Sequence, residues 1–252
     1  MAYSDYDDED KIKAVYLRDV ANRLKTLLNA QHVQIFEHTV SHGNPLCIPA
    51  HDFLICQHVN LLSKGPKASR HIPNLYRLGL HLQSATSIAH VDTTSPWAVA
   101  MAAQLNPSRA NELRSGKARI QCVNFWRPIT GPVQDWPLAL CSATSIKEPS
   151  KQLEPCDLVY PDYVVENRQV YHDTGYDWFY ASEMMPNEAW VFLQSDTDPS
   201  TKPVAHTAFP LSEDLDPSSM PARESIEVRA LVYYGGFEDV VDVDVSKSIT
   251  PS

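Results

Sequence analysis

The chain has 252 residues, enough for one sizeable domain or two small ones, and 43% of them are hydrophobic and 21% charged. No stretch approaches the roughly 20 consecutive apolar residues of a membrane-spanning helix. With 21 basic and 31 acidic side chains the formal charge is −10, so we expect neither nucleic acid nor membrane as a partner.

The N-terminal part is predicted to be helical. Residues 1–10 are acidic, and we expect them to be flexible. Residues 11–30 have apolar side chains at the three-and-four spacing that places them on one face of a helix. A short strand at residues 33–36 follows. Residues 41–73 have no clean period and contain several proline and glycine turns, so we expect loops with at most one short helix.

Two further helices are indicated by their end signals. Ser95 is the expected N-cap of a helix over residues 96–105, with Pro96 at its first position. The other helix covers residues 108–114 and ends at Gly116. Up to residue 116 the chain is therefore helix-rich, although it includes a strand around residue 90.

After residue 117 the pattern changes to short aromatic and β-branched runs separated by Pro, Gly, Asp and Asn, which is typical of strands. The expected strands cover residues 119–126, 138–142, 157–165, 170–184, 189–194, 204–209 and 225–234. Strands at short spacing after a helical start predict a mainly β (α+β) fold, a β-sandwich or jelly roll with flanking helices. We expect one domain over residues 1–252, with a β-rich core at 117–244 and a polar tail at 245–252.

The cysteines are five in number, widely spaced and without a C-x-x-C pair: Cys47, Cys56, Cys122, Cys141 and Cys156. This pattern favours small buried thiols over disulfides or a thiolate zinc site. A reducing compartment fits best, and we therefore predict a cytoplasmic protein.

A candidate metal site begins at His90 and Asp92, which point to the same side of an extended strand. His206 lies in a second strand-like run, and two histidines with one carboxylate can hold three positions of an octahedral iron(II). Taken alone, the His-x-Asp tripeptide is common by chance, and His206 is equally well explained as a hydrogen-bonded core histidine. We expect all three to be iron ligands because an Arg-x-Ser pair with matching chemistry comes after them in the chain.

Arg223 and Ser225 form this pair and share a strand face. A guanidinium beside a hydroxyl suits the distal carboxylate of a dicarboxylic co-substrate. The order His-x-Asp, His, Arg-x-Ser is expected of an iron(II)/2-oxoglutarate oxygenase. Arg229 lies on the same strand face and is the rival anchor, while a surface ion pair with Glu224 is the ordinary alternative for Arg223.

The other histidines have no carboxylate at strand spacing, so we expect surface or capping roles for them. They are His32, His38, His42, His51, His58, His71, His81 and His172.

Several blocks resemble one family of fungal biosynthetic oxygenases. The most specific are NFWRPI at residues 124–129 and GPVQDWPLALC at 131–141, and VQIFEHTV (33–40), AHVDTT (89–94) and PARESIEVRALVY (221–233) are similar to the family as well. The family includes gibberellin desaturase-like and aspergillic acid hydroxylase/desaturase-like enzymes, meroterpenoid endoperoxygenases and cephamycin methoxylation proteins. Two parts depart from its pattern: the chain begins close to the first helix, so a strand or lid is expected to be missing, and residues 41–83 match poorly.

The resemblance implies a double-stranded β-helix (jelly roll, cupin-like) core that uses Fe(II), 2-oxoglutarate and molecular oxygen. Carried over by position, His90, Asp92 and His206 match the metal ligands, and Arg223 and Ser225 match the co-substrate anchor. The resemblance also implies a small, largely apolar secondary metabolite as substrate. It leaves open a homodimer or a heterodimer with a related chain.

Strand parity gives further expectations for the pocket. Asn124 and Trp126 share one face, where Asn124 is expected to donate to the inner carboxylate of the co-substrate and Trp126 to line the pocket. Arg127, on the other face, is expected to pair with Asp135. The aromatic residues Trp178 and Tyr180, with Tyr176 before them, alternate at strand period and are candidates for the pocket wall, with plain packing as the alternative.

The sequence therefore predicts an Fe(II)/2-oxoglutarate-dependent dioxygenase, an oxidoreductase of hydroxylase or desaturase type. Two alternatives remain open. One is a redox-neutral isomerase on the same metal fold, and the other is a non-catalytic partner subunit of an active family member.

Overall fold

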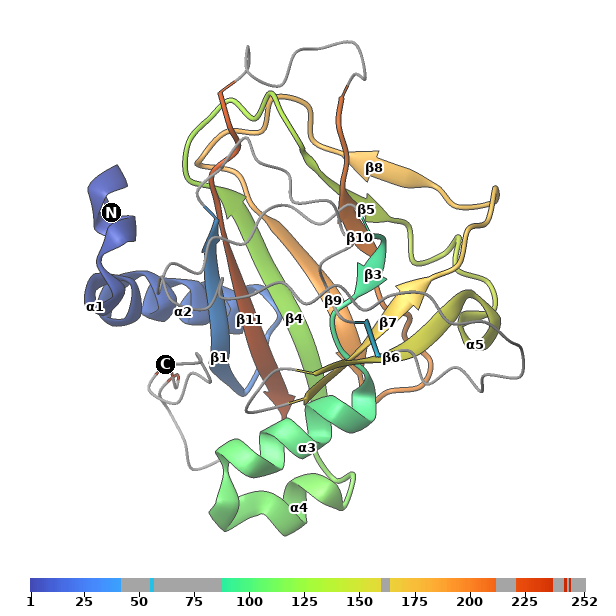
Figure 1. Ribbon diagram of the computed structural model, residues 1–252. Helices are drawn as coiled ribbons and strands as arrows, with labels where there is room; N and C mark the ends of the chain where they lie inside the picture. The colour runs from blue at the N-terminus through green and yellow to red at the C-terminus, as the bar shows by residue number, and fades with distance from the viewer. Residues whose placement is uncertain are drawn as a thin grey trace.

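The computed structural model describes residues 1–41, 55–56, 88–159, 164–211, 221–237, 243 and 245, and its strands form two antiparallel sheets (Figure 1). The four-stranded sheet has the order β1 (His32–Ser41), β11 (Ser225–Tyr234), β4 (Arg119–Pro128), β9 (Trp190–Asp196). The seven-stranded sheet has the order β2 (Ile55–Cys56), β6 (Leu153–Val159), β7 (Val164–Val170), β3 (His90–Val91), β10 (His206–Ala208), β5 (Leu138–Cys141), β8 (Trp178–Tyr180).

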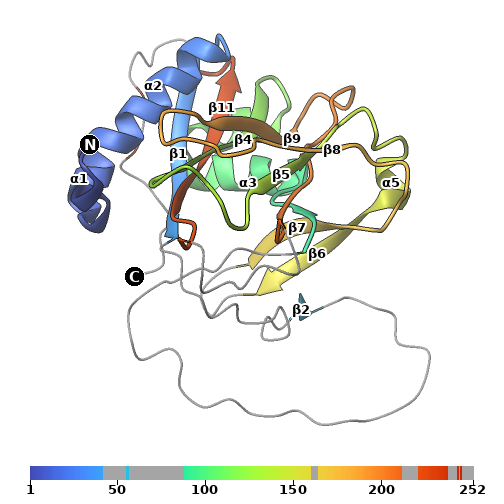
Figure 2. The same cartoon turned by 90° about the horizontal axis from the view of Figure 1, so that it is seen from above.

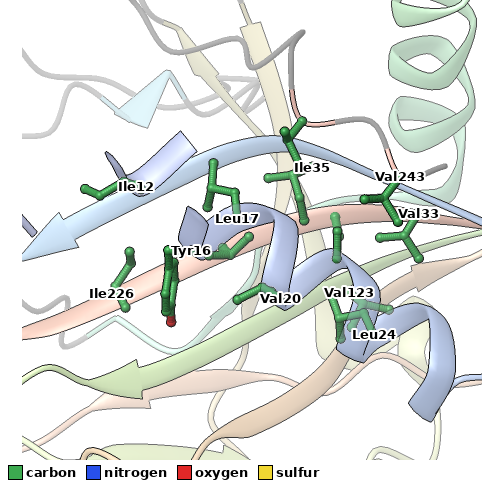
Figure 3. Packing of buried hydrophobic residues seen from close by; sticks show 14 of the residues in the cluster. Ile12, Tyr16, Leu17, Val20, Leu24, Val33, Ile35, Val123, Ile226 and Val243 are labelled. Atoms are coloured by element: carbon green, nitrogen blue, oxygen red, sulfur yellow. The ribbon is translucent and has the colours of Figure 1, made fainter. Parts of the chain in front are cut away.

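The N-terminal helices cover the outer face of the four-stranded sheet (Figure 2). They are a 3₁₀ turn (Tyr3–Asp7), α1 (Glu9–Lys11), a π-helical turn (Ile12–Tyr16) and α2 (Leu17–Leu27). Side chains one helical turn apart on α2 pack onto alternate residues of β1 and β11, so the helical and strand periodicities meet in one apolar layer (Figure 3). This layer fixes which face of β1 and β11 is left for the interior.

The prediction that residues 1–10 are flexible is wrong. Tyr6 is only 5% exposed, and its ring packs edge-on against Tyr16 with 5.6 Å between ring centroids. The Tyr3 hydroxyl donates to Glu224, just before β11. These aromatic contacts bind the acidic start to the helical layer.

Helix α3 (Ser95–Leu105) covers one part of the inner face of the same sheet (Figure 1). Its apolar residues pack on inward side chains of β1, β4 and β11, among them Phe36 and Leu231. The N-cap is Thr94, whose hydroxyl accepts from the Trp97 N–H, rather than the expected Ser95. A 3₁₀ turn (Pro107–Arg109) and α4 (Ala110–Arg114) follow. Gly116 has φ +74°, the left-handed conformation predicted for the end of that helix.

The strands of the seven-stranded sheet differ in detail from the expected runs. Residues 157–165 were expected to form one strand, but residues 157–159 belong to β6 and residues 164–165 to β7. Within the run 170–184, Val170 ends β7 and Trp178–Tyr180 forms β8, and helix α5 (Pro149–Gln152) was not predicted. Short strands with exposed polar residues carry little periodicity, and their pairing is decided by the neighbouring strands.

A mainly β fold with flanking helices is confirmed. The part of the inner face of the four-stranded sheet that α3 leaves uncovered faces the seven-stranded sheet, and the two are joined there by apolar contacts of Trp126 and Phe192 with Leu138 and Leu140. Among the described residues, no helix combines the length and apolar character needed to cross a bilayer.

Candidate metal centre

His90, Asp92 and His206 come together between the two sheets, as predicted. Strands β3 and β10 pair so that His206 is directly opposite His90, and their ring centroids lie 4.3 Å apart. Asp92 follows β3, with one carboxylate oxygen 3.3 Å from His90 Nε2 and the other 3.8 Å from His206 Nε2. Potential ligand atoms of the three residues all lie within 4.8 Å of one another, and they form the one such group among the described residues.

The charges in this group are compatible with a divalent cation that takes the place of the His90 proton. His90 Nδ1 lies 2.7 Å from the Ile88 carbonyl and donates to it, and Nε2 lies 3.3 Å from Asp92. Burial acts to lower the pKa of His90, but the hydrogen bond and the charge of Asp92 outweigh it and raise the pKa. Burial, reinforced by the charge of His90, lowers the pKa of His206 to about 3, so that imidazole is neutral. Burial acts to raise the pKa of Asp92, but the charge of Arg229, together with the contacts of Asp92 with the two histidines, holds it well below the usual range. A carboxylate and neutral imidazoles are the ligands that such an ion requires.

Asp92 is held by three further side chains. Arg229 donates through Nε to Oδ2 at 3.1 Å and through Nη2 to Oδ1 at 3.3 Å. Asn124 Nδ2 also donates to Oδ2, and Gln194 Oε1 accepts from the Asp92 backbone N–H at 2.6 Å. The carboxylate is therefore fixed by the four-stranded sheet, whereas both imidazoles come from the other sheet.

Arg223 lies just before β11, six residues from Arg229, and is differently surrounded. Its Nη1 donates to the Trp136 carbonyl at 2.6 Å, and its guanidinium lies 5.3 Å from the centre of the Trp126 ring. Burial lowers the pKa of Arg223 to about 10, against the opposing charges of Glu227 and Asp135. No ion pair of Arg223 occurs among the residues that the structure describes, and the expected alternative partner Glu224 accepts from Tyr3 instead. Ser225, 2% exposed, begins β11 on the same strand face.

Arg229, the rival anchor, is already engaged. Its guanidinium contacts three carboxylates, those of Asp92, Glu37 at 2.9 Å and Glu227 at 2.7 Å. All three of its nitrogen atoms take part in these contacts. A guanidinium in this state has no free edge for another carboxylate.

One expectation for β4 needs correction and another stays a prediction. Asn124 lies on the inner face, where its amide donates to Asp92; an amide nitrogen has a second N–H, so its expected contact with the co-substrate stays a prediction. Arg127 does not pair with Asp135. It faces the helical layer, where it donates to the Tyr6 hydroxyl and lies over the rings of Tyr6 and Tyr16. Arg127 was correctly predicted to lie on the face opposite Asn124, but its partner there is Tyr6 of the N-terminal segment.

Trp126 and the aromatic residues of β8 lie in different places. Trp126 is 3% exposed and faces the interior beside Arg223. Strand pairing extends the inner face of the seven-stranded sheet through Glu154, Gln169, His90, His206, Leu140 and Phe179. Trp178 and Tyr180 flank Phe179 and therefore point to the opposite face, so the expectation that they line the pocket is corrected. Phe179, 59% exposed, is the residue of β8 that lies on the inner face.

Two other histidines are buried, although the sequence pattern predicted surface or capping roles for them. His32 stacks on Phe237 at 4.5 Å, and His38 Nε2 lies 3.1 Å from a Glu9 carboxylate oxygen. His172 is exposed, as expected. The expectations for His42, His51, His58, His71 and His81, and for most of residues 41–83, lie outside the described residues.

Sequence reasoning missed Glu37 and Gln194. Both lie next to an irregularity in strand register, which side-chain alternation along a strand does not reveal. Glu227 and Arg229, in contrast, share the strand face of Arg223 and Ser225, and this parity was the signal for them.

The chain is similar to several known proteins. A family model described as an oxidoreductase/YMDC permease-like domain matches residues 1–233. The chain is 31% identical over 245 residues to the alpha-ketoglutarate-dependent dioxygenase tstK of Talaromyces stipitatus, covering 93% of this chain and 74% of tstK.

Two further relatives match over shorter segments. Aspirochlorine biosynthesis protein N of Aspergillus oryzae is 34% identical over 132 residues, covering 51% of this chain and 53% of that protein. The hydroxylase/desaturase efuI of Hormonema carpetanum is 32% identical over 158 residues, covering 58% and 50%. These matches span about half the length of the two relatives.

Among solved structures, that of the iron and alpha-ketoglutarate-dependent endoperoxidase NvfI is similar, with a TM-score of 0.69 and 24% identity over 91% of this chain and 72% of NvfI. This likeness confirms the predicted fold, a double-stranded β-helix core with flanking helices.

Proposed function

The chain belongs to the family of fungal iron(II)/2-oxoglutarate-dependent oxygenases, and from this premise we propose that it oxidises a small, largely apolar secondary metabolite by hydroxylation or desaturation. The proposed iron ligands are His90, Asp92 and His206. The observation that carries the proposal is that these three side chains, from separate parts of the chain, present two imidazoles and a carboxylate within 4.8 Å of one another.

The residues around the cluster fit a dication. Asp92, Glu37 and Glu227 place three carboxylates around the single guanidinium of Arg229, and all four side chains are at most 23% exposed. Buried charge of one sign is costly unless it is compensated. A divalent cation beside Asp92 would supply this compensation, and three protein ligands would leave positions open for a co-substrate and oxygen.

We propose that Arg223 and Ser225 bind the distal carboxylate of 2-oxoglutarate. Arg223 supports this role because its only described polar partner is the Trp136 carbonyl, which leaves N–H donors for a carboxylate. Its guanidinium lies over Trp126, whose strand neighbour Asn124 contacts Asp92. Two residues along a strand span about 7 Å, a distance that a short dicarboxylate can bridge.

Bound iron(II), 2-oxoglutarate and molecular oxygen would supply the oxidation, in which 2-oxoglutarate becomes succinate and carbon dioxide while the substrate loses hydrogen or gains oxygen. The protein's own part is positioning. Asp92 and the histidines set the place of the reaction, Arg223 sets the direction of the co-substrate, and Trp126 and Phe192 keep water from one side.

An apolar substrate is supported by the inner face beside His206. Leu140 and Phe179 continue the row of His206 on one side, and Gln169 adjoins His90 on the other. We propose that the substrate contacts this row. The hydroxylase/desaturase name of efuI supports the type of reaction.

The remaining properties are proposals as well. We propose one domain over residues 1–252 and a cytoplasmic location, which the buried free thiols of Cys122, Cys141 and Cys156 support. A dimer with itself or with a related chain stays a prediction, as does the absence of nucleic acid and membrane partners.

The test uses the full chain and small, largely apolar secondary metabolites as candidate substrates. Anaerobic addition of iron(II) and 2-oxoglutarate should give a weak visible charge-transfer band, and admitting oxygen together with a candidate substrate should release succinate. His206→Ala should remove both signals, because one imidazole ligand is lost. The matched control is His172→Ala, which removes an exposed histidine outside the cluster and should change neither signal.

The other outcomes overturn the proposal in different ways. A band without succinate, together with a product of unchanged mass, would identify the isomerase. Absence of the band together with a stable complex with a related chain would identify the partner subunit.

A further inference from the structure

Arg229 has a structural setting that the proposed co-substrate anchor does not explain. It lies in β11, paired with Glu37 of β1 on one side and Asn124 of β4 on the other. Its side chain contacts both oxygens of the Asp92 carboxylate, and Glu37 and Glu227 occupy the rest of the guanidinium. Glu37 and Glu227 therefore hold the Arg229 guanidinium while it donates to Asp92.

Glu37 reaches this place through a β-bulge. Ile35 packs in the helical layer, and strict alternation would turn Glu37 to that same outer face. The register of β1 against β11 shifts between Ile35 and Glu37, so Phe36 and Glu37 both face inward. A bulge re-aims a side chain in this way and is common next to active sites.

A second β-bulge, in β9, directs polar side chains to Asp92 and Thr93. The register of β9 against β4 shifts so that Gln194 is an extra residue between Leu193 and Ser195. Gln194 accepts from the Asp92 N–H at 2.6 Å, and Ser195 shares a hydrogen bond of 2.8 Å with Thr93. The two register shifts of this sheet thus both direct polar side chains to Asp92 or its neighbours.

We infer that Arg229 is a positioning residue for the metal site, that it holds the Asp92 carboxylate in place for the ion, and that Glu37 holds Arg229. This inference rests on the proposed function, because it presumes that Asp92 is a metal ligand. It assigns Arg229 a role separate from that of Arg223: Arg229 acts through Asp92 on metal affinity, whereas Arg223 acts on the co-substrate.

The test measures manganese(II) binding, as a redox-inert substitute for iron(II), from the electron paramagnetic resonance signal of the free ion. Arg229→Lys keeps the charge but loses the two-point grip, and it should raise the Kd for manganese about 10- to 100-fold. Glu37→Gln should raise the Kd in the same direction by up to about 10-fold. The Kd for 2-oxoglutarate at saturating manganese should stay unchanged in both variants.

The matched control is Arg119→Lys. Arg119 also grips a carboxylate at two points, that of Asp196, in the same sheet, but it does not contact Asp92. The Arg119→Lys variant should bind manganese with the Kd of the wild type. The melting temperature of each metal-free variant shows whether it is folded, and Glu37→Gln keeps the test decisive if Arg229→Lys does not fold.

Wild-type affinity for manganese in both Arg229→Lys and Glu37→Gln would overturn the inference while leaving the proposed function intact. So would a loss confined to 2-oxoglutarate binding, which would make Arg229 the anchor. Failure of the wild-type protein itself to bind manganese would overturn the proposed function instead.

Discussion

Arg223 and Arg229 lie six residues apart and differ mainly in what surrounds their guanidinium groups. Arg229 is neutralised by three carboxylates, whereas Arg223 has a carbonyl and an aromatic ring as described partners. A doubly charged co-substrate binds where positive charge is uncompensated and donors are free. Arg223 meets both conditions.

We therefore predict that Arg223→Ala raises the Kd for 2-oxoglutarate at saturating metal by at least about 30-fold, which corresponds to about 2 kcal/mol for a truncated charge-assisted contact. The Kd for the metal should change less than about threefold, because Arg223 does not contact the three ligands. Isothermal titration without oxygen measures the Kd for the metal on the metal-free protein and the Kd for 2-oxoglutarate on the metal-loaded protein.

Arg168→Ala is the control for that prediction. Arg168 is also half-buried, with burial lowering its pKa, but it pairs with Val91, which faces away from the site. It should leave both constants unchanged. If Arg223→Ala bound 2-oxoglutarate normally, another residue would have to bind the distal carboxylate.

At the residue scale, strand parity determined how much the sequence could reveal. Parity placed His90 with Asp92 and Arg223 with Ser225, because both pairs lie on or beside regular strands. It did not decide between Arg223 and Arg229, because the choice depends on Glu37, which a bulge turns inward. It also grouped Trp178 with Tyr180 correctly, but the face they share is fixed only by pairing with β5.

At the scale of elements, β4 and β9 are held together beyond their backbone pairing by Asp196. Arg119 and Gln121 of β4 donate to its carboxylate, as does the backbone N–H of Asp198. Burial acts to raise the pKa of Asp196, but these hydrogen bonds outweigh it and the pKa is lowered. The ionised form is therefore more favourable in the folded protein than in the unfolded chain.

Asp196→Asn should lower the free energy of unfolding at pH 7 by about 1 kcal/mol, a modest value because Arg119 is partly exposed and screened by solvent. A lowered pKa contributes stability above the unfolded value of about 3.9. That contribution is lost as the pH falls through the lower folded value, so the difference between variant and wild type should shrink below about pH 4. Urea unfolding at pH 7, 5 and 3 measures it. A difference that is equal at all three pH values would show that Asp196 acts through packing alone.

Elements with strong local signals were predicted well. The apolar stripe that includes Leu17, Val20 and Leu24 gave the N-terminal helix, and the alternation in residues 225–234 gave β11 with its observed bounds. Weak signals failed: β8 and α5 are short, and the N-terminal acidic residues looked flexible because Tyr6 finds its partners only in the folded structure. Tertiary contacts between distant segments leave no local pattern.

At the scale of the whole molecule, the site exists only where the two sheets meet. The seven-stranded sheet supplies both histidines, and the four-stranded sheet supplies Arg229, Asn124 and Gln194, which hold Asp92. Arg223 and Ser225, at the start of β11, adjoin the same space. The helical layer and α3 fix the four-stranded sheet from both faces, which keeps these groups in register with the histidines.

The most direct measurement is a crystal structure of the protein grown without oxygen in the presence of manganese(II) and 2-oxoglutarate. We predict one metal ion per chain, ligated by His90, Asp92 and His206, with the distal carboxylate of 2-oxoglutarate on Arg223 and Ser225. A metal ion bound elsewhere, or these three side chains intact with no ion between them at saturating manganese, would contradict the account.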